Sequence, residues 1–116
     1  MGMNAEVIAI GPFKRSLAKD RHLAYGPDVY EDTKEGESVI VPVIHMRTNQ
    51  GSTDLAEALG TEAWAMGKHV IDISKINWKR LQKVLDEQDK FESSGDVEGM
   101  RELADAGFKF YYLPQG

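Results

Sequence analysis

The stretch from Ser38 to Arg47, SVIVPVIHMR, constrains the fold more than any other part of the sequence. Valine and isoleucine dominate it, and β-branched side chains are restricted at χ1 and pack well on a pleated sheet. Simple alternation gives this strand two apolar faces: Val39, Val41 and Val43 on one, and Ile40, Ile44 and Met46 on the other. Such a strand needs cover on both sides or a place in mid-sheet beneath helices. We therefore predict that it is the core strand.

Pro42 interrupts this strand. Because proline has no N–H to donate to a neighbouring strand, it is confined to edge strands and bulges. Two arrangements follow: an edge strand covered by helices, or a central strand with a bulge at Pro42. We favour the bulge.

Local signals predict further elements between residues 6 and 73. The sequence predicts a first strand over residues 6–10, ended by Gly11 and Pro12, and a short helix over 14–20. Phe13 and Leu17 should face inward from that helix because they are four residues apart. A helix over 54–59 should open with a capping box, close at Gly60 and follow a loop over 48–52. A helical turn over 61–66, anchored by Trp64, and a brief strand over 70–73 come next.

The second half of the chain predicts two helices and a strand. Ser74 should open a helix whose apolar side chains, from Ile76 to Phe91, fall near a 3.6-residue period, and Ser94 and Gly95 should end it. Asp96 should cap a last helix, ended by Gly107, with Val97, Met100, Leu103 and Ala104 buried. Residues 108–113 alternate as a final strand ended by Pro114. This order predicts one α+β domain over 1–116, with a small, mostly antiparallel sheet and helices packed on it.

Length and composition limit the function classes. The chain has 116 residues, enough for one domain with its own core. It contains no cysteine, which excludes disulfides and a thiol nucleophile and fits a reducing cytoplasm. No apolar run approaches the ~18 residues of a membrane span, so we expect no membrane partner. Met3 is expected to be the natural start, with Met1 and Gly2 as a cloning remnant. The oligomeric state is left open.

A net charge of −5 argues against a dedicated nucleic-acid binder, because binding to phosphates requires a basic surface. The same charge suits a basic protein partner. From Asp86 to Asp105 there are eight acids against Lys90 and Arg101, just after a basic block. This order opposes the helix macrodipole and indicates a surface that serves a partner, although a charged helix face is usually only solvated.

The segment from Tyr25 to Glu37 combines five acids with two tyrosines and a single lysine. Tyrosines anchor protein interfaces, and carboxylates imitate phosphates and accelerate encounter with a basic cleft. We predict the partner-binding residues to be the tyrosines and acids Tyr25, Asp28, Tyr30, Glu31, Asp32 and Glu35. The alternative interpretation is a solvated turn before a strand.

Three strings extend this hypothesis: IAIGPF at 8–13, YGP at 25–27 with YEDTKEG at 30–36, and GFKFYYLP at 107–114. Together they resemble small bacterial proteins of the immunity type, which are encoded beside secreted polymorphic toxins and neutralise them by tight binding. The resemblance implies a single cytoplasmic α+β domain without catalysis. It names no toxin class; a basic nuclease would suit the charge.

Motifs for catalysis, cofactors and metals are missing. The three histidines, His22, His45 and His69, lack the spacing of zinc ligands, and no phosphate loop or dinucleotide fingerprint occurs. We therefore predict no catalytic residue, metal ligand or cofactor. The alternative function is a small-molecule-binding or enzymatic domain with a pocket near His45 and a carboxylate such as Glu37 or Asp72.

The string LAEALG at 55–60 resembles the first helix and turn of helix-turn-helix proteins. The residues after it do not continue that pattern, because Gly67 would break a recognition helix and residues 61–67 include no lysine or arginine to reach DNA. A DNA-binding function is therefore the third-ranked hypothesis.

Overall fold

The computed structural model describes residues 4–18, 33–64, 67–88 and 93–115. The elements in chain order are β1 (Asn4–Pro12), α1 (Arg15–Ala18), β2 (Ser38–Met46), α3 (Asn49–Leu59), β3 (His69–Ile71), the 3-10 helix η1 (Ile73–Lys75), α4 (Trp78–Glu87), β4 (Ser93–Gly95), α5 (Val97–Asp105) and β5 (Lys109–Gln115). Strands and helices are mixed along the chain and share one hydrophobic core. The predicted α+β class is confirmed.

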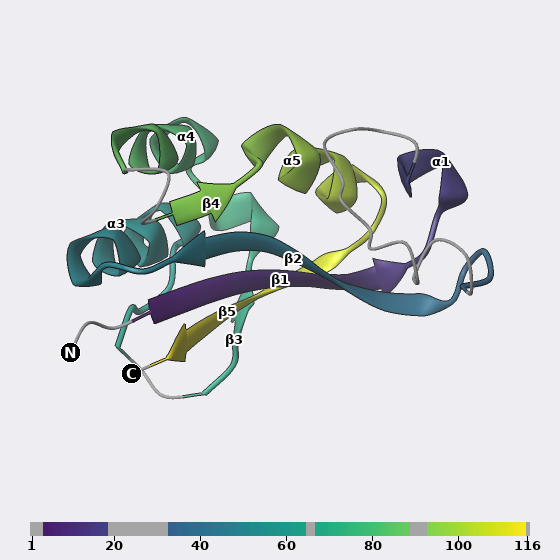
Figure 1. Ribbon diagram of the computed structural model, residues 1–116, viewed down its shortest axis with the longest axis horizontal. Helices are drawn as coiled ribbons and strands as arrows, with labels where there is room; N and C mark the ends of the chain where they lie inside the picture. The colour runs from purple at the N-terminus through teal and green to yellow at the C-terminus, as the bar shows by residue number, and fades with distance from the viewer. Residues whose placement is uncertain (1–3, 19–32, 65–66, 89–92, 116) are drawn as a thin grey trace.

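The five strands form one sheet in the order β3-β5-β1-β2-β4, and every neighbouring pair is antiparallel (Figure 1). The central strand is β1, which pairs along almost its whole length with β2 and with β5. The predicted core strand, β2, therefore lies beside the centre of the sheet.

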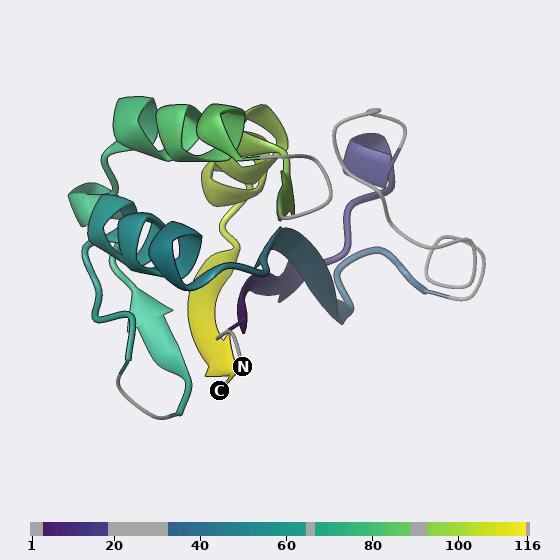
Figure 2. The same cartoon turned by 60° about the vertical axis from the view of Figure 1, so that its left-hand side comes forward.

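Helices α3, α4 and α5 all lie against one face of the sheet (Figure 2). Burial along β1 follows this arrangement, because Ala5, Val7 and Ala9 are completely buried while the residues between them are half-buried. The helices contribute Leu55, Leu59, Leu81, Met100 and Leu103 to the same core. The sheet is thus buried on its helix-covered face, and the described residues place no helix on the other.

A bulge lies in β2 beside Pro42, as predicted. Val7 pairs with Ile44 but Ile8 pairs with Pro42, so Val43 is an extra residue in β2. One extra residue shifts the alternation by one position. Val41 therefore shares the buried face with Ile44 and Met46, and Ile40 is 61% exposed. The assignment of faces by simple alternation was wrong for this physical reason.

Two predicted strand ends were also wrong. β1 continues through Gly11 to Pro12, and β5 continues through Pro114 to Gln115. Pro42 and Pro114 both lie where an outer neighbour has stopped pairing, since β4 pairs with β2 only at residues 44–46 and β3 pairs with β5 only at 110–112. At such a position no outer strand offers a carbonyl to pair with. The missing N–H of proline therefore costs no hydrogen bond on that side.

The first long helix, α3, begins five residues before the predicted Asp54. Its N-cap is Thr48, whose hydroxyl accepts a hydrogen bond from the Gly51 amide at 3.0 Å. The predicted end is confirmed, because Gly60 has a φ of 74° and the amides of Gly60 and Thr61 donate to Glu57 and Ala56. This is a Schellman motif.

Residues 61–64 do not continue as the predicted helical turn, and Met66 lies outside the described residues. Trp64 is 56% exposed and is not the anchor that we expected. The predicted strand near residue 70 is confirmed as β3.

Helix α4 begins at Trp78, after the predicted start at Ser74, and ends at Glu87. Ser94 and Gly95, which were expected to end this helix, lie in β4. Asp72 caps only the short η1, and Asn77 caps α4 by accepting from the Arg80 amide at 3.1 Å. The backbone amide of Asn77 donates to the backbone carbonyl of Ala58 at 2.8 Å. This bond holds the start of α4 beside the end of α3, which the periodicity of α4 could not reveal.

Helix α5 agrees with its prediction except at Ala104. Asp96 accepts from the Gly99 amide at 3.0 Å, and Val97, Met100 and Leu103 are buried, whereas Ala104 is only partly buried. Gly107 has a φ of 92°, and the Phe108 amide donates to the Leu103 carbonyl at 3.0 Å. The helix thus ends in a second Schellman motif that leads into β5.

Phe108 packs on the backbone of Gly11. A Cβ atom at Gly11 would lie 2.6 Å from the Phe108 ring, which is 1% exposed. The substitution Gly11→Ala should therefore lower the free energy of unfolding by about 1–3 kcal/mol, measured by urea denaturation. The matched control is Gly11→Ala in a Phe108→Leu background, where the cost should be smaller. An equal cost in both backgrounds would exclude the ring as the cause.

Tyr112 reaches from β5 into the buried layer beneath α3. Its hydroxyl lies 3.3 Å from the Ala63 carbonyl and 3.5 Å from the Ser52 carbonyl, and the side chain is completely buried. Burial raises the pKa of Tyr112 to about 12. An unfolded tyrosine loses its proton near pH 10, so the folded state holds the proton longer.

Stability should consequently fall between pH 10 and 12, because the unfolded chain binds fewer protons than the folded chain there. Tyr112→Phe should make this fall shallower and cost about 1 kcal/mol at neutral pH. The measurement is urea denaturation at a series of pH values. Tyr111→Phe, on the opposite face of the sheet, is the matched control and should keep the wild-type slope.

Candidate functional site

The predicted partner-binding segment is described only at its end. Tyr25, Asp28, Tyr30, Glu31 and Asp32 lie outside the described residues, and Glu35 lies within them. Glu35 is exposed and stands beside the start of α1. Its two carboxylate oxygens accept from the Arg15 amide at 2.7 and 3.2 Å.

Residues 33–37 are attached to residues 13–15 by several bonds. The Arg15 guanidinium donates to the Thr33 carbonyl at 3.1 Å. The Phe13 amide donates to the Glu37 carbonyl at 2.7 Å, and the Gly36 amide donates to the Phe13 carbonyl at 2.8 Å. Phe13 itself is completely buried. The base of the acidic segment is thus attached to a buried residue, and Glu35 takes part in that attachment.

His45 lies on the uncovered face of the sheet, in register with Glu6 on β1 and with Ser94 on β4. Asp72 follows β3 at the other end of the strand order, with β5 and β1 between β3 and β2. The suggested pairing of His45 with Asp72 is therefore wrong. His45 contributes to neither of the two hollows described next.

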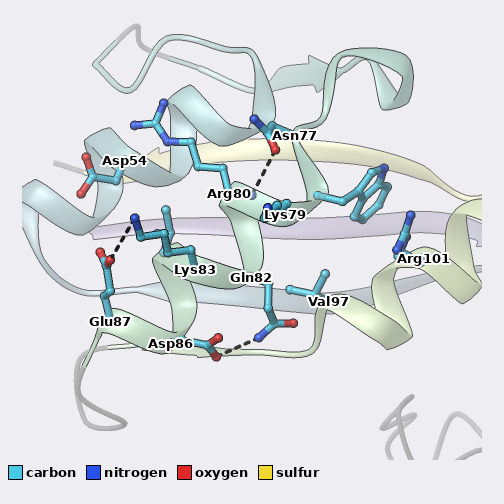
Figure 3. A pocket seen from close by; sticks show the side chains of 12 residues that line it. Asp54, Asn77, Lys79, Arg80, Gln82, Lys83, Asp86, Glu87, Val97 and Arg101 are labelled. Atoms are coloured by element: carbon cyan, nitrogen blue, oxygen red, sulfur yellow. Dashed lines mark hydrogen bonds and ion pairs between the residues drawn. The ribbon is translucent and has the colours of Figure 1, made fainter.

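The larger hollow, which we call the helical groove, is an open groove of about 1260 Å³ along α4 (Figure 3). Its lining residues come from α3, α4, α5 and the α4 cap: Asp54, Asn77, Trp78, Lys79, Arg80, Gln82, Lys83, Val84, Asp86, Glu87, Val97 and Arg101. The smaller hollow, about 300 Å³, lies between α3 and residues 61–64, beside Trp64.

Most charged groups of the helical groove already have partners. Arg80 forms an ion pair with Glu57 of α3, Lys83 lies 3.9 Å from Glu87, and the Arg101 guanidinium lies 5.1 Å from the Trp78 ring centre. Gln82 donates to Asp86 at 2.8 Å (Figure 3). Groups that satisfy one another at an exposed surface are typical of a solvated helix face, and we assign the groove no ligand.

The charges of α4 run against its dipole, as the sequence indicates. Lys79 and Arg80 occupy the first turn, where the helix end is positive, and Asp86 and Glu87 occupy the last turn, where it is negative. No acid lies in the first turn and no basic residue in the last. Helix α4 is therefore less stable than a helix with acids in its first turn and basic residues in its last turn would be.

The fold also bears on the DNA-binding hypothesis and on possible metal and membrane binding. Helix α3 is followed by β3, and residues 61–64 and 67–68 are not helical, so the described residues between α3 and β3 include no recognition helix. Within the described ranges, no group of three or more histidine, aspartate or glutamate side chains could hold a metal ion. None of the helices in this part of the chain is long and apolar enough to cross a bilayer.

Comparisons with known proteins yield no relative. No family model, no curated protein and no solved structure matches the chain.

Reversing the first charge of α4 tests whether this surface sacrifices stability. Lys79→Glu should raise the free energy of unfolding by about 0.3–1 kcal/mol, because a negative charge then lies at the positive end of the helix. Urea denaturation at low salt measures the change. Lys79→Gln, which only removes the charge, should give a smaller gain, and a Lys79→Glu variant less stable than wild type would contradict this account.

Proposed function

We propose that the chain is a non-enzymatic inhibitor of the bacterial immunity type, which binds a basic toxin in the cytoplasm and occludes its active cleft. A nuclease is the toxin class that the charge favours, because an acidic inhibitor can occupy a cleft built for phosphates. The contact residues are Tyr25, Asp28, Tyr30, Glu31, Asp32 and, at the base, Glu35.

The observation that carries this proposal is the attachment of residues 33–37 to residues 13–15. A binding loop that is anchored at its base loses less conformational entropy on binding than a loop with flexible ends. Here the bonds from Arg15 and from buried Phe13 fix one end of a segment that is dense in acids and tyrosines.

Charge gives the second argument. A chain of net charge −5 is drawn toward a basic protein over several ångströms, and acids at the rim of an interface mainly raise the association rate. The tyrosines Tyr25 and Tyr30 then supply the apolar anchors that retain the complex. The inhibitor performs no chemistry; it competes with substrate for the cleft.

A capture experiment from the source cells tests the proposal. The tagged chain is exposed to a nuclease-treated lysate and washed at low and then high salt. The proposal expects one basic protein in near-stoichiometric amount, whose enzymatic activity is inhibited when the purified chain is added back. A captured protein whose activity the chain leaves unchanged would contradict the proposal.

Charge reversal then tests the contact residues. The double variant Glu31→Lys and Asp32→Lys should weaken toxin binding about ten-fold or more and flatten its dependence on salt, measured by titration calorimetry or surface plasmon resonance. Glu35 is left intact because it holds the start of α1. The matched control is Glu62→Lys with Asp105→Lys, two exposed acids elsewhere with the same total change in charge. If both variants weakened toxin binding equally, net charge alone would explain the effect, and the acidic segment would be excluded as the contact site.

A further inference from the structure

The face of the sheet on which the described residues place no helix is apolar over four strands. We define the outer sheet face by the side chains that point away from the helices in register: Glu6, Ile8 and Ile10 of β1; Ile40, Pro42 and His45 of β2; Val70 of β3; and Lys109, Tyr111 and Leu113 of β5. One row across the sheet, Val70, Tyr111, Ile8 and Pro42, contains no charge. Val70 is 67% exposed and Ile40 is 61% exposed.

A surface of this kind is costly in a monomer. Antiparallel sheets that face water carry polar side chains on that face, whereas contiguous exposed apolar patches mark interaction sites. The helix-covered face already accounts for the core of the domain. We propose that the outer sheet face is the interface of a symmetric homodimer, in which two copies of the chain stack sheet against sheet. This inference does not depend on the inhibitor function.

Charge selects a second copy as the occupant. Among the residues of the outer sheet face, Glu6 is negative and Lys109 is positive, and the Lys68 amine lies 4.6 Å from the centre of the Tyr111 ring. A two-fold interface brings the same patch against itself, so it needs both signs or none. With Lys68 counted, this face carries two positive groups and one negative group, so both signs are present although the whole chain is acidic. A basic toxin would instead be attracted to the acids elsewhere.

The size of the face suits a weak dimer. Strands β5, β1 and β2 at ~4.8 Å each, over seven residues at ~3.4 Å each, give roughly 340 Å² of flat area, and the three residues of β3 add roughly 50 Å². The total is roughly 400 Å² per copy, or roughly 800 Å² for two. Specific interfaces bury about 1,000 Å² or more of accessible surface, so a contact of this size gives a weak dimer. Stacked sheets lie ~10 Å apart, which two layers of isoleucine, valine and tyrosine side chains fill. We therefore expect dimerisation only at high micromolar concentrations.

Analytical ultracentrifugation from about 1 to 500 μM tests the dimer. Wild type should pass from monomer to dimer in this range. Ile40→Lys with Val70→Lys should raise the dissociation constant at least ten-fold, and these exposed positions should tolerate lysine without unfolding. Trp64→Lys removes an equally exposed apolar side chain outside the outer sheet face and should leave dimerisation unchanged. A monomer at every concentration, or a dimer that the double lysine variant does not weaken, would overturn the proposal.

The absence of cysteine allows a second, site-specific measurement. A single thiol at Ile40→Cys should react more slowly with a maleimide as protein concentration rises, whereas one at Lys83→Cys on α4 should react at a constant rate. A monomer in which the Ile40→Cys thiol is slow even at low concentration would show that another part of the same chain covers the face. An Ile40→Cys thiol that reacts quickly at all protein concentrations would show that no second copy covers the face. Either result would overturn the homodimer.

Discussion

The pairing of β1 with β2 and β5 is the constraint on which the rest of this structure depends. The extra residue Val43 interrupts the β1–β2 register once, and that single shift decides which side chains meet the helices. Without it, Val41 would lie on the opposite face from Ile44 and Met46, and the layer beneath α3 would lose part of its apolar cover. Pro42 lies beside this bulge, where β4 no longer pairs with β2. The register of β2 and its contribution to the core therefore depend on one residue.

The helices are held by local bonds that complement this sheet. Two Schellman motifs, at Gly60 and Gly107, end α3 and α5 and direct the chain onward, while the bond from the Asn77 amide to the Ala58 carbonyl places the start of α4. The close approach of Phe108 to Gly11 then joins the start of β5 to the end of β1. These contacts leave three helices on one face, and the apolar outer sheet face follows from that imbalance.

Both roles proposed for this molecule are binding roles. Residues 33–37, at the end of the acidic segment, are bonded to Arg15 and Phe13. In the helical groove, by contrast, charged side chains pair with one another. The proposed partners differ accordingly: a basic protein for the acidic, tyrosine-containing segment of the sequence, and a second copy for the apolar outer sheet face.

Sequence patterns determined the α+β class, the bulge beside Pro42, the cap at Asp96, the ends of α3 and α5 and the buried alternation of Phe108, Phe110 and Tyr112. These features depend on residues close together in the chain, where backbone sterics and local hydrogen bonds act directly. The tertiary structure alone decided the rest. The place of the start of α4, the exposure of Trp64, the separation of His45 from Asp72 and the attachment of Glu35 to Arg15 all depend on segments distant in sequence. The start of α3 is different, because its cap is a bond from the Gly51 amide to the nearby Thr48 hydroxyl, a local signal that the prediction overlooked. The outer sheet face belongs to this second group, because a strand that is apolar on both sides does not reveal which of its faces the helices will cover.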